Sequence, residues 1–165
     1  YPVTGMSYPS GSYNSEVAAV MRACGIDYSR TVAATGDFDL PENFLVWHPT
    51  CHFKNAMPAV ERFMNSLDSQ WTKPLLYIWG HSHELLCEED WRQFEQVLKA
   101  VSGDKRIWYA TNMDIFNYAA AQKTLKISAD ETIIYNPSGS EVWVEKDKLR
   151  KIKIPAGETV RNIAR

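Results

Sequence analysis

Two imidazoles and a carboxylate directly follow one apolar segment of the chain. Residues 75–79 form a continuous apolar run, as expected of a strand buried on both faces, and Gly80 ends it. His81, His83 and Glu84 come next. Catalytic groups of α/β proteins usually lie just past the carboxyl ends of such strands, and an imidazole suits general acid or base catalysis near neutral pH. His81 is therefore the first candidate catalytic residue; the alternative is a core histidine with satisfied polar atoms.

The other two histidines have the spacing of a metal-binding pair. His48 and His52 are four residues apart, so a helix would bring their rings together. Pro49 is compatible with a helix that starts at His48, but Asn55 and Pro58 favour a later start. No glutamate follows in the H-E-x-x-H manner. Ordinary loop or core histidines are the favoured interpretation.

Polar side chains also stand in two expected loops. Ser10 and Ser12 lie in a Gly-flanked loop, residues 5–13, ahead of a predicted helix. A serine esterase needs G-x-S-x-G after a strand, which this loop lacks, so a turn is favoured. Its backbone N–H groups could still form an oxyanion site. Asp37 and Asp39 follow another predicted strand; they could orient a histidine or bind substrate hydroxyls, or simply be solvated.

These side chains must be positioned by alternating helices and strands. The expected N-caps are Asn14 or Ser15, Asp90, and Thr111 or Asn112. Helices end near Gly25, residue 67, Gly103 and residue 123, and strands are predicted over residues 26–32, 75–79 and 106–110. The order α-β-α-β-α-β-α predicts a parallel sheet with right-handed crossovers.

From about residue 125 the pattern changes to short alternating segments separated by turns. Strands are predicted over residues 125–128, 132–135, 141–144 and 151–154. We expect an antiparallel meander of four or five strands. The predicted organisation is one domain overall, with a (β/α) region over residues 1–124 and a β-rich tail, residues 125–165, packed on it.

Composition limits the possible partners. A chain of 165 residues is long enough for one domain with a real core, and a net charge of -2 gives no basic field for nucleic acid or an anionic membrane. No apolar run approaches the roughly 20 residues of a membrane span, and no signal peptide is visible. Because the chain opens at Tyr1, a mature form or a fragment is possible, so a soluble protein in the cytoplasm, or secreted with its signal removed, is expected.

Cysteine and aromatic residues carry less information. Cys24, Cys51 and Cys87 have no metal-like spacing and are expected to be small buried apolar residues rather than a disulfide framework. Aromatic residues make up 12% of the chain. Most of these rings are expected in the core, and the alternative is that some line a carbohydrate groove.

Several segments, in order along most of the chain, resemble the C-terminal half of the polysaccharide deacetylases, carbohydrate esterase family 4. The segments that carry the resemblance are GMSYPSGSYN at 5–14, IDYSRT at 26–31, FDLP at 38–41, WHPTCH at 47–52, LYIWGH at 76–81, IWYATN at 107–112 and IPAGET at 154–159. The resemblance implies an enzyme that removes acetyl groups from a polysaccharide or oligosaccharide. It also implies part of a distorted (β/α) barrel with parallel strands.

The resemblance assigns roles to individual residues. In that family one Asp and two His hold a divalent metal, a second Asp is the general base, and a late His is the general acid. His81 matches the general acid. Residues 7–10 match the family's R-x-P-Y loop, so the Ser10 backbone N–H would face the oxyanion. Trp47 matches the aromatic floor of the acetyl pocket, and Tyr8 and Trp79 are further predicted substrate-binding residues.

The departures from the family are as informative as the matches. The T-F-D-D-G strand and the family's H-x-x-x-H metal motif are absent, and Ser7 replaces the loop arginine. His48 and His52 come after the loop, so the metal role is not transferred to them and no metal ligand is assigned. Zinc is expected only if a front half or a partner chain supplies the ligands.

An incomplete barrel would expose a sheet edge, which favours association. We therefore expect a homodimer or a complementary chain, unless the tail covers the edge. Two other functions remain open: a non-catalytic carbohydrate-binding remnant, and a metal-independent serine esterase.

Overall fold

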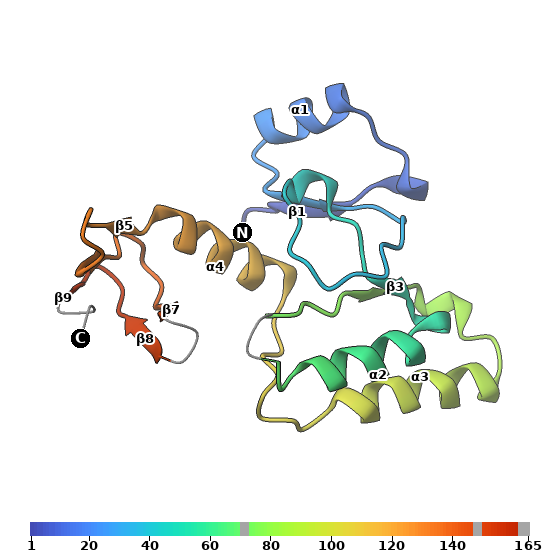
Figure 1. Ribbon diagram of the computed structural model, residues 1–165. Coiled ribbons are helices and arrows are strands. Elements are labelled where there is room, and N and C mark those ends of the chain that lie inside the picture. Colours follow the sequence, from blue (N-terminus) through green and yellow to red (C-terminus); the bar gives the residue numbers. More distant parts are fainter. Residues whose placement is uncertain (70–72, 147–149, 162–165) are drawn as a thin grey trace. The chain divides into compact units, whose positions relative to one another are not determined.

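The computed structural model describes residues 1–69, 73–146 and 150–161, which form two compact units, Tyr1–Tyr109 and Ala110–Arg165. The protein is mixed α/β, as the sequence predicted (Figure 1). The units separate after Tyr109, ahead of the last helix, whereas the sequence prediction placed its division after residue 124. The helices are α1 (Ser15–Ala23), α2 (Met57–Ser66) and α3 (Glu88–Val101) in the first unit and α4 (Asn112–Thr124) in the second.

The strands of the first unit are short and pair in parallel. They are β1 (Gly5–Ser7), β2 (Tyr28–Arg30), β3 (Cys51–His52) and β4 (Ile78–Trp79). β1 pairs with β2 and β3 pairs with β4, both in parallel, and a parallel bridge joins Arg30 to Trp47. Helix α1 connects β1 to β2, and α2 lies between β3 and β4, so the predicted parallel pairing is confirmed. Closure into a barrel stays a prediction.

The segment expected to be a long buried strand is shorter and less buried than predicted. Only Ile78–Trp79 pairs as a strand, and residues 75–79 are half-buried. The Thr50 hydroxyl accepts a hydrogen bond from the Tyr77 N–H at 3.0 Å and lies 3.4 Å from the Leu75 carbonyl oxygen. The Thr50 side chain thus hydrogen-bonds backbone groups that a strand ladder would otherwise pair, and regular pairing begins only at Ile78.

Two of the three predicted helix caps are correct. The Asn14 side chain accepts from the Val17 N–H at 2.8 Å, and the Thr111 hydroxyl accepts from the Asp114 N–H at 3.2 Å. The prediction of Asp90 as an N-cap is wrong, because α3 begins at Glu88, after Cys87. Three acidic residues in succession suit the first turn of a helix, so the start shifts toward the N-terminus.

The strand predicted over residues 106–110 is absent from the structure. The Asp104 carboxylate binds both the Arg106 backbone N–H at 2.9 Å and its guanidinium. These bonds with Arg106 hold the pKa of Asp104 at about 2. The Tyr109 hydroxyl also donates to the Val101 carbonyl at 2.6 Å. Local side-chain bonds therefore turn the chain back toward α3 instead of extending it.

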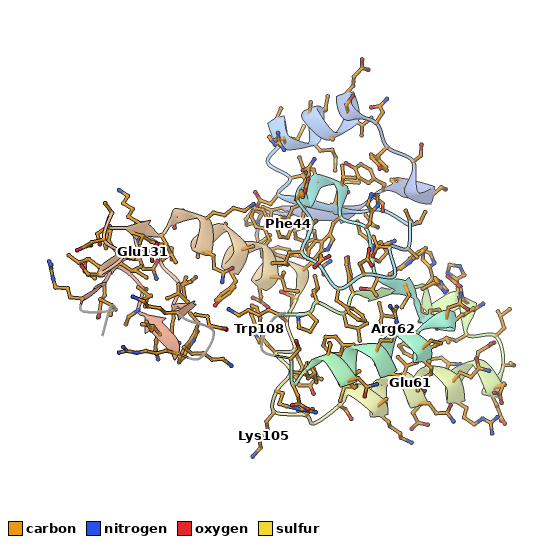
Figure 2. All side chains as sticks on the ribbon, in the orientation of Figure 1. Phe44, Glu61, Arg62, Lys105, Trp108 and Glu131 are labelled. Atoms are coloured by element: carbon orange, nitrogen blue, oxygen red, sulfur yellow. The ribbon has the colours of Figure 1, made fainter. Side chains whose placement is uncertain are left out.

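Helices α2 and α3 lie side by side and share a small core (Figure 1). The buried residues of that core are Cys51, Ala56, Ala59, Val60 and Val97. Cys51 is thus buried as predicted, whereas Cys24 and Cys87 are exposed, contrary to the prediction, and all three are free thiols. On α2, Arg62 (Figure 2) donates to the Gly36 carbonyl at 2.9 Å, which ties the loop after β2 to the helix.

The second unit carries the antiparallel strands. They are β5 (Lys126–Ile127), β6 (Ile133–Tyr135), β7 (Val142–Lys146), β8 (Arg150–Ile154) and β9 (Thr159–Arg161). The antiparallel pairing is confirmed, but the strands do not form one meander. β9 pairs with β6 in a sheet of order β5-β6-β9, and β7 pairs with β8 in a separate hairpin. The sequence pattern gives no information on which strands pair.

Asn136 links the strands of the second unit, and its removal should destabilise that unit. It is 0% exposed; its amide donates to the carbonyls of Ser140 (2.8 Å) and Ile154 (3.1 Å), while its oxygen accepts from Ser138 N (3.0 Å). Asn136→Ala leaves these buried groups unpaired, so we expect a loss of about 1–3 kcal/mol in unfolding free energy. Urea denaturation with Asn117→Ala, an exposed asparagine of α4, as the control tests this, and an unchanged midpoint would contradict it.

Candidate functional site

His81 lies at the carboxyl end of β4, on a short turn. The turn, residues Ser82–Glu84, follows Gly80 and leaves the His81 side chain 49% exposed. A Cβ atom on Gly80 would lie 2.0 Å from Cδ1 of Phe53. Only glycine therefore lets the end of β4 pass over the Phe53 ring. The close approach is what places His81 beside the end of β3.

One carboxylate connects the histidines of two strands. The Nδ1 atom of His81 lies 2.6 Å from Oε1 of Glu84, and Nε2 of His52, at the end of β3, lies 3.0 Å from Oε2. The Glu84 side chain is 21% exposed, and the Lys54 ammonium lies 3.7 Å away. Hydrogen bonds from His81, and then from His52, lower the pKa of Glu84 to about 2, against a desolvation effect that raises it. Glu84 is therefore ionised at every pH well above 2.

An aromatic frame surrounds these groups. The rings of His52 and His81 each approach Trp79 edge-on, at centroid distances of 4.9 and 5.5 Å, and the Arg30 guanidinium lies over Trp79 at 4.3 Å. His83 stacks on His81 at 4.9 Å. Packing therefore fixes the site's rings from several sides, although His81 itself remains half-exposed.

The indole nitrogen of Trp79 bears on the predicted binding role of this residue. Among the described residues, its indole N–H is a buried donor without a hydrogen-bond partner. A ligand or another segment that offered an acceptor would satisfy it, which favours a binding role.

Arg30, whose guanidinium lies over Trp79, pairs in register with Ser7, the position where the resemblance expects an arginine. The neighbouring strand thus carries a guanidinium beside that position.

The structure does not bring His48 and His52 together as a metal pair. The His48 Nδ1 lies 2.6 Å from the Thr31 hydroxyl, whereas His52 bonds to Glu84. The residues between them are extended or bent rather than helical, so a spacing of four gives no common face. The sequence interpretation that favoured ordinary loop histidines therefore agrees with the geometry for His48, but His52 belongs to the His81 site.

The loop with Ser10 follows β1, at the same edge as the other strand ends. Ser10 has a left-handed φ of 52°, and the Ser12 N–H donates to the Pro9 carbonyl at 3.1 Å. In the described part of the chain, no hydrogen bond joins the hydroxyl of Ser10 or Ser12 to a histidine. Tyr8 is 3% exposed, and its hydroxyl donates to the Leu45 carbonyl at 2.8 Å. This geometry favours a structural role for Tyr8.

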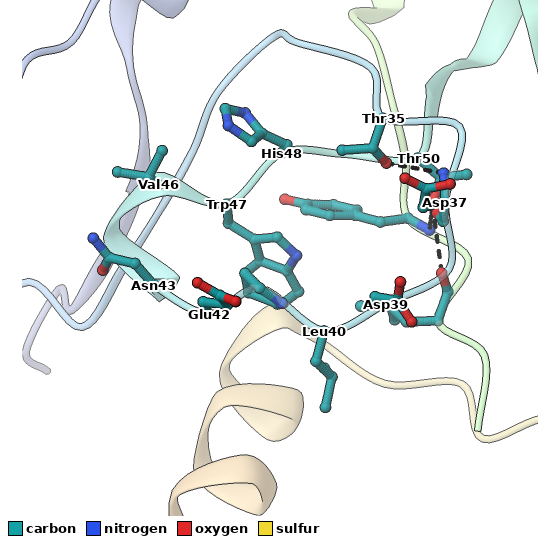
Figure 3. A pocket seen from close by; sticks show the side chains of 13 residues that line it. Thr35, Asp37, Asp39, Leu40, Glu42, Asn43, Val46, Trp47, His48 and Thr50 are labelled. Atoms are coloured by element: carbon teal, nitrogen blue, oxygen red, sulfur yellow. Dashed lines mark hydrogen bonds between the residues drawn. The ribbon is translucent and has the colours of Figure 1, made fainter. Parts of the chain in front are cut away.

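A cavity of about 330 Å³ lies at the loop after β2 (Figure 3). Asp37 and Asp39 line it together with Trp47, His48 and Tyr77. The two aspartates were suggested as groups that orient a histidine, but the carboxylate that contacts His81 is Glu84. Sequence reasoning missed that role, although Glu84 stands three residues after His81, a separation at which side chains on one turn can meet.

The described residues contain one group of three possible metal ligands, His81, His83 and Glu84, with ligand atoms within 4.8 Å of one another. This set differs from the one Asp and two His that the resemblance implies. Glu84 is also already bonded to two imidazoles. The residues present therefore do not fit the family's metal, and we derive no step through it.

Comparison with known proteins returned no match to a family model, a curated protein or a solved structure. Within the described residues, the helices are all too short or too polar to cross a membrane.

The pKa of Glu84 predicts a pH dependence of stability. Folding lowers this pKa from 4.5 to about 2, so the stabilisation is complete above about pH 4.5 and is lost as the pH falls toward 2. Glu84→Gln cannot ionise and should lack this contribution. We expect the melting temperatures of the two proteins to differ near pH 6 and to converge near pH 2. A difference that is constant over this range would contradict the prediction.

Proposed function

We propose that this chain is part of a carbohydrate deacetylase of the polysaccharide deacetylase type, with His81 as the general acid. The observation that carries the proposal is the placement of His81 on an exposed turn at the carboxyl end of a parallel strand, with Nδ1 against an ionised carboxylate. Such strand ends are where α/β enzymes place their catalytic groups.

The geometry is suited to one proton transfer. Glu84 accepts a hydrogen bond from Nδ1–H of His81, which leaves Nε2 as the ring nitrogen that faces a substrate. When the bond between the acetyl carbon and the leaving nitrogen or oxygen breaks, Nε2–H gives its proton to the leaving amine or alcohol. The Ser10 N–H is proposed to stabilise the oxyanion. The metal and the general base that would activate the attacking water have no assigned counterpart among these residues.

The pairing of β1 supports the need for a further segment. Among the described residues, β1 pairs with one strand, β2, and its other edge is unpaired. An unpaired edge is a place for strand addition. We propose that additional strands, from another part of the protein or from a partner chain in a homodimer or complementary assembly, complete the sheet and supply the metal and the base.

Acetate release tests the proposal. The protein is incubated with acetylated xylan and with acetylated chitooligosaccharides, with and without added Zn²⁺, and acetate is quantified. We expect metal-dependent release from at least one of the two substrates. No release from either substrate by the full protein would contradict the proposal.

The cavity favours a second candidate, a non-catalytic carbohydrate-binding remnant. It combines two carboxylates, Asp37 and Asp39, with the rings of Trp47 and Tyr77, and His81 is not part of it. Carboxylates and aromatic rings suit hydroxyls and the apolar faces of sugars. Calorimetric titration with the same oligosaccharides after acetyl removal distinguishes the two: binding without metal and without acetate release favours the remnant.

A further inference from the structure

We propose that Glu84 is a positioning residue that ties His81 to His52 and thereby fixes the ring orientation and the tautomer of His81. The inference deepens the proposed function, because it assigns the groups that hold its general acid. The link itself is a property of the chain that can be measured without any substrate.

The Glu84 carboxylate contacts histidines of two strands. Its Oε1 lies 2.6 Å from Nδ1 of His81, three residues earlier on the same turn. Nε2 of His52, at the end of β3, lies 3.2 Å from Oε1 and 3.0 Å from Oε2. His52 and Trp79 are directly paired in the parallel ladder between β3 and β4. The carboxylate therefore spans the two strands at the point where the ladder ends.

His52 is the anchor and His81 the exposed ring. The His52 ring lies 4.6 Å from Phe53 and 4.9 Å from Trp79, and its Nδ1 accepts from the Lys54 N–H at 3.4 Å. With Nδ1 used as an acceptor, Nε2–H is the donor to Glu84. His81 has no comparable enclosure, so Glu84 is the polar group that fixes its orientation.

The other charged neighbours do not supply the same link. Lys54 approaches Glu84 only at 3.7 Å and is itself half-exposed, so it adds a screened attraction. Arg30 lies over the Trp79 ring, and His83 stacks on the His81 face rather than on a ring nitrogen. Within the described residues, Glu84 is the carboxylate that contacts His81.

A fixed Nδ1–H tautomer has a defined consequence for catalysis. The protonated ring loses its proton from Nε2 to the leaving group, while the other proton stays on Nδ1 and keeps its hydrogen bond to Glu84. Without the carboxylate the ring rotates more freely, and the neutral form shifts toward the Nε2–H tautomer. Carboxylates that hydrogen-bond a metal-ligating imidazole typically contribute about 10- to 100-fold to metal affinity or activity, and we expect an effect of that size at His81.

The test compares Glu84→Gln and His52→Phe with Glu89→Gln as a matched control. Glu89 is an exposed glutamate of α3 that pairs with Arg92, away from the histidines. The ¹⁵N resonances of the His81 ring in the full chain report its tautomer, and kcat and KM are measured in parallel. We expect Glu84→Gln to lose the Nδ1–H signature and to lower kcat about 10- to 100-fold at constant KM. Glu89→Gln should match the wild type.

His52→Phe keeps an aromatic ring between Phe53 and Trp79 but removes the bond to Glu84. It should lower kcat less than Glu84→Gln does. Added to Glu84→Gln it should have no further effect, because His52 acts through the carboxylate. Additive losses would overturn the role of His52.

The failure of this proposal is distinguishable from the failure of the proposed function. An unchanged His81 tautomer in folded Glu84→Gln would overturn the positioning role, whatever the activity. Absence of acetate release with the expected tautomer change would instead overturn the deacetylase function and leave the link intact.

Discussion

Replacement of His81 by glutamine is expected to lower the rate of acetate release by about 10²- to 10⁴-fold, the usual contribution of a general acid. Glutamine keeps a polar side chain but cannot donate a proton to a leaving group. Because His81 is half-exposed, its loss should leave the fold intact. We expect the effect in kcat, with a small change in KM, measured by acetate release at saturating substrate.

His83→Gln is the matched control for this experiment. His83 belongs to the same turn and stacks on the His81 ring, so a change there disturbs the local packing in a similar way. It should nevertheless retain activity close to that of the wild type. Equal losses in the two variants would show that the turn matters as a structure and that His81 is not the acid.

Chemical rescue separates acid catalysis from positioning. His81→Gly removes the ring and leaves room beside Trp79, so imidazole in solution can enter. Partial recovery of activity with added imidazole, and not with an apolar azole analogue of similar size, is expected if the ring delivers a proton. Retention of full activity in His81→Gln without rescue agents would contradict the assignment.

Local chemistry explains which parts of the fold the sequence could predict. The caps at Asn14 and Thr111 are set by side chains within three residues of the bonds that they make. Alternation of helices and strands likewise predicts parallel pairing. By contrast, the strand predicted over residues 106–110 is replaced by a turn, because Asp104 and Arg106 satisfy each other and the backbone locally. Polar pairs of this kind override β-propensity.

The candidate site shows a different limit. His81 could be selected because it follows an apolar run, which is information within a few residues. Its link to His52 depends on Glu84, which lies 32 residues after His52, and on the pairing of β3 with β4. No spacing rule relates His52 to Glu84. Sequence reasoning therefore found the exposed ring but not the group that anchors it.

The second large effect is expected at Trp47, whose replacement by alanine should cost about 3–5 kcal/mol of unfolding free energy. Trp47 is 1% exposed, and its ring contacts those of Phe44 and Tyr77 at 5.0 and 4.8 Å. Its backbone also bonds to Ser29 and Thr31 of the neighbouring segment, so the side chain packs where two extended segments meet. The cavity left by removal of the Trp47 side chain should destabilise the first unit as a whole.

Guanidinium denaturation measures this effect, with Trp91→Ala as the control. Trp91, on α3 of the same unit, is largely exposed, so its loss should change stability by about 1 kcal/mol or less.

Trp47→Phe keeps an aromatic ring and should recover much of the stability that Trp47→Ala loses. It also separates packing from the predicted substrate role: if Trp47 forms the floor of the acetyl pocket, stable Trp47→Phe should raise KM, and if the residue only packs, KM should be unchanged. Equal stabilities for Trp47→Ala and Trp91→Ala would contradict the packing argument.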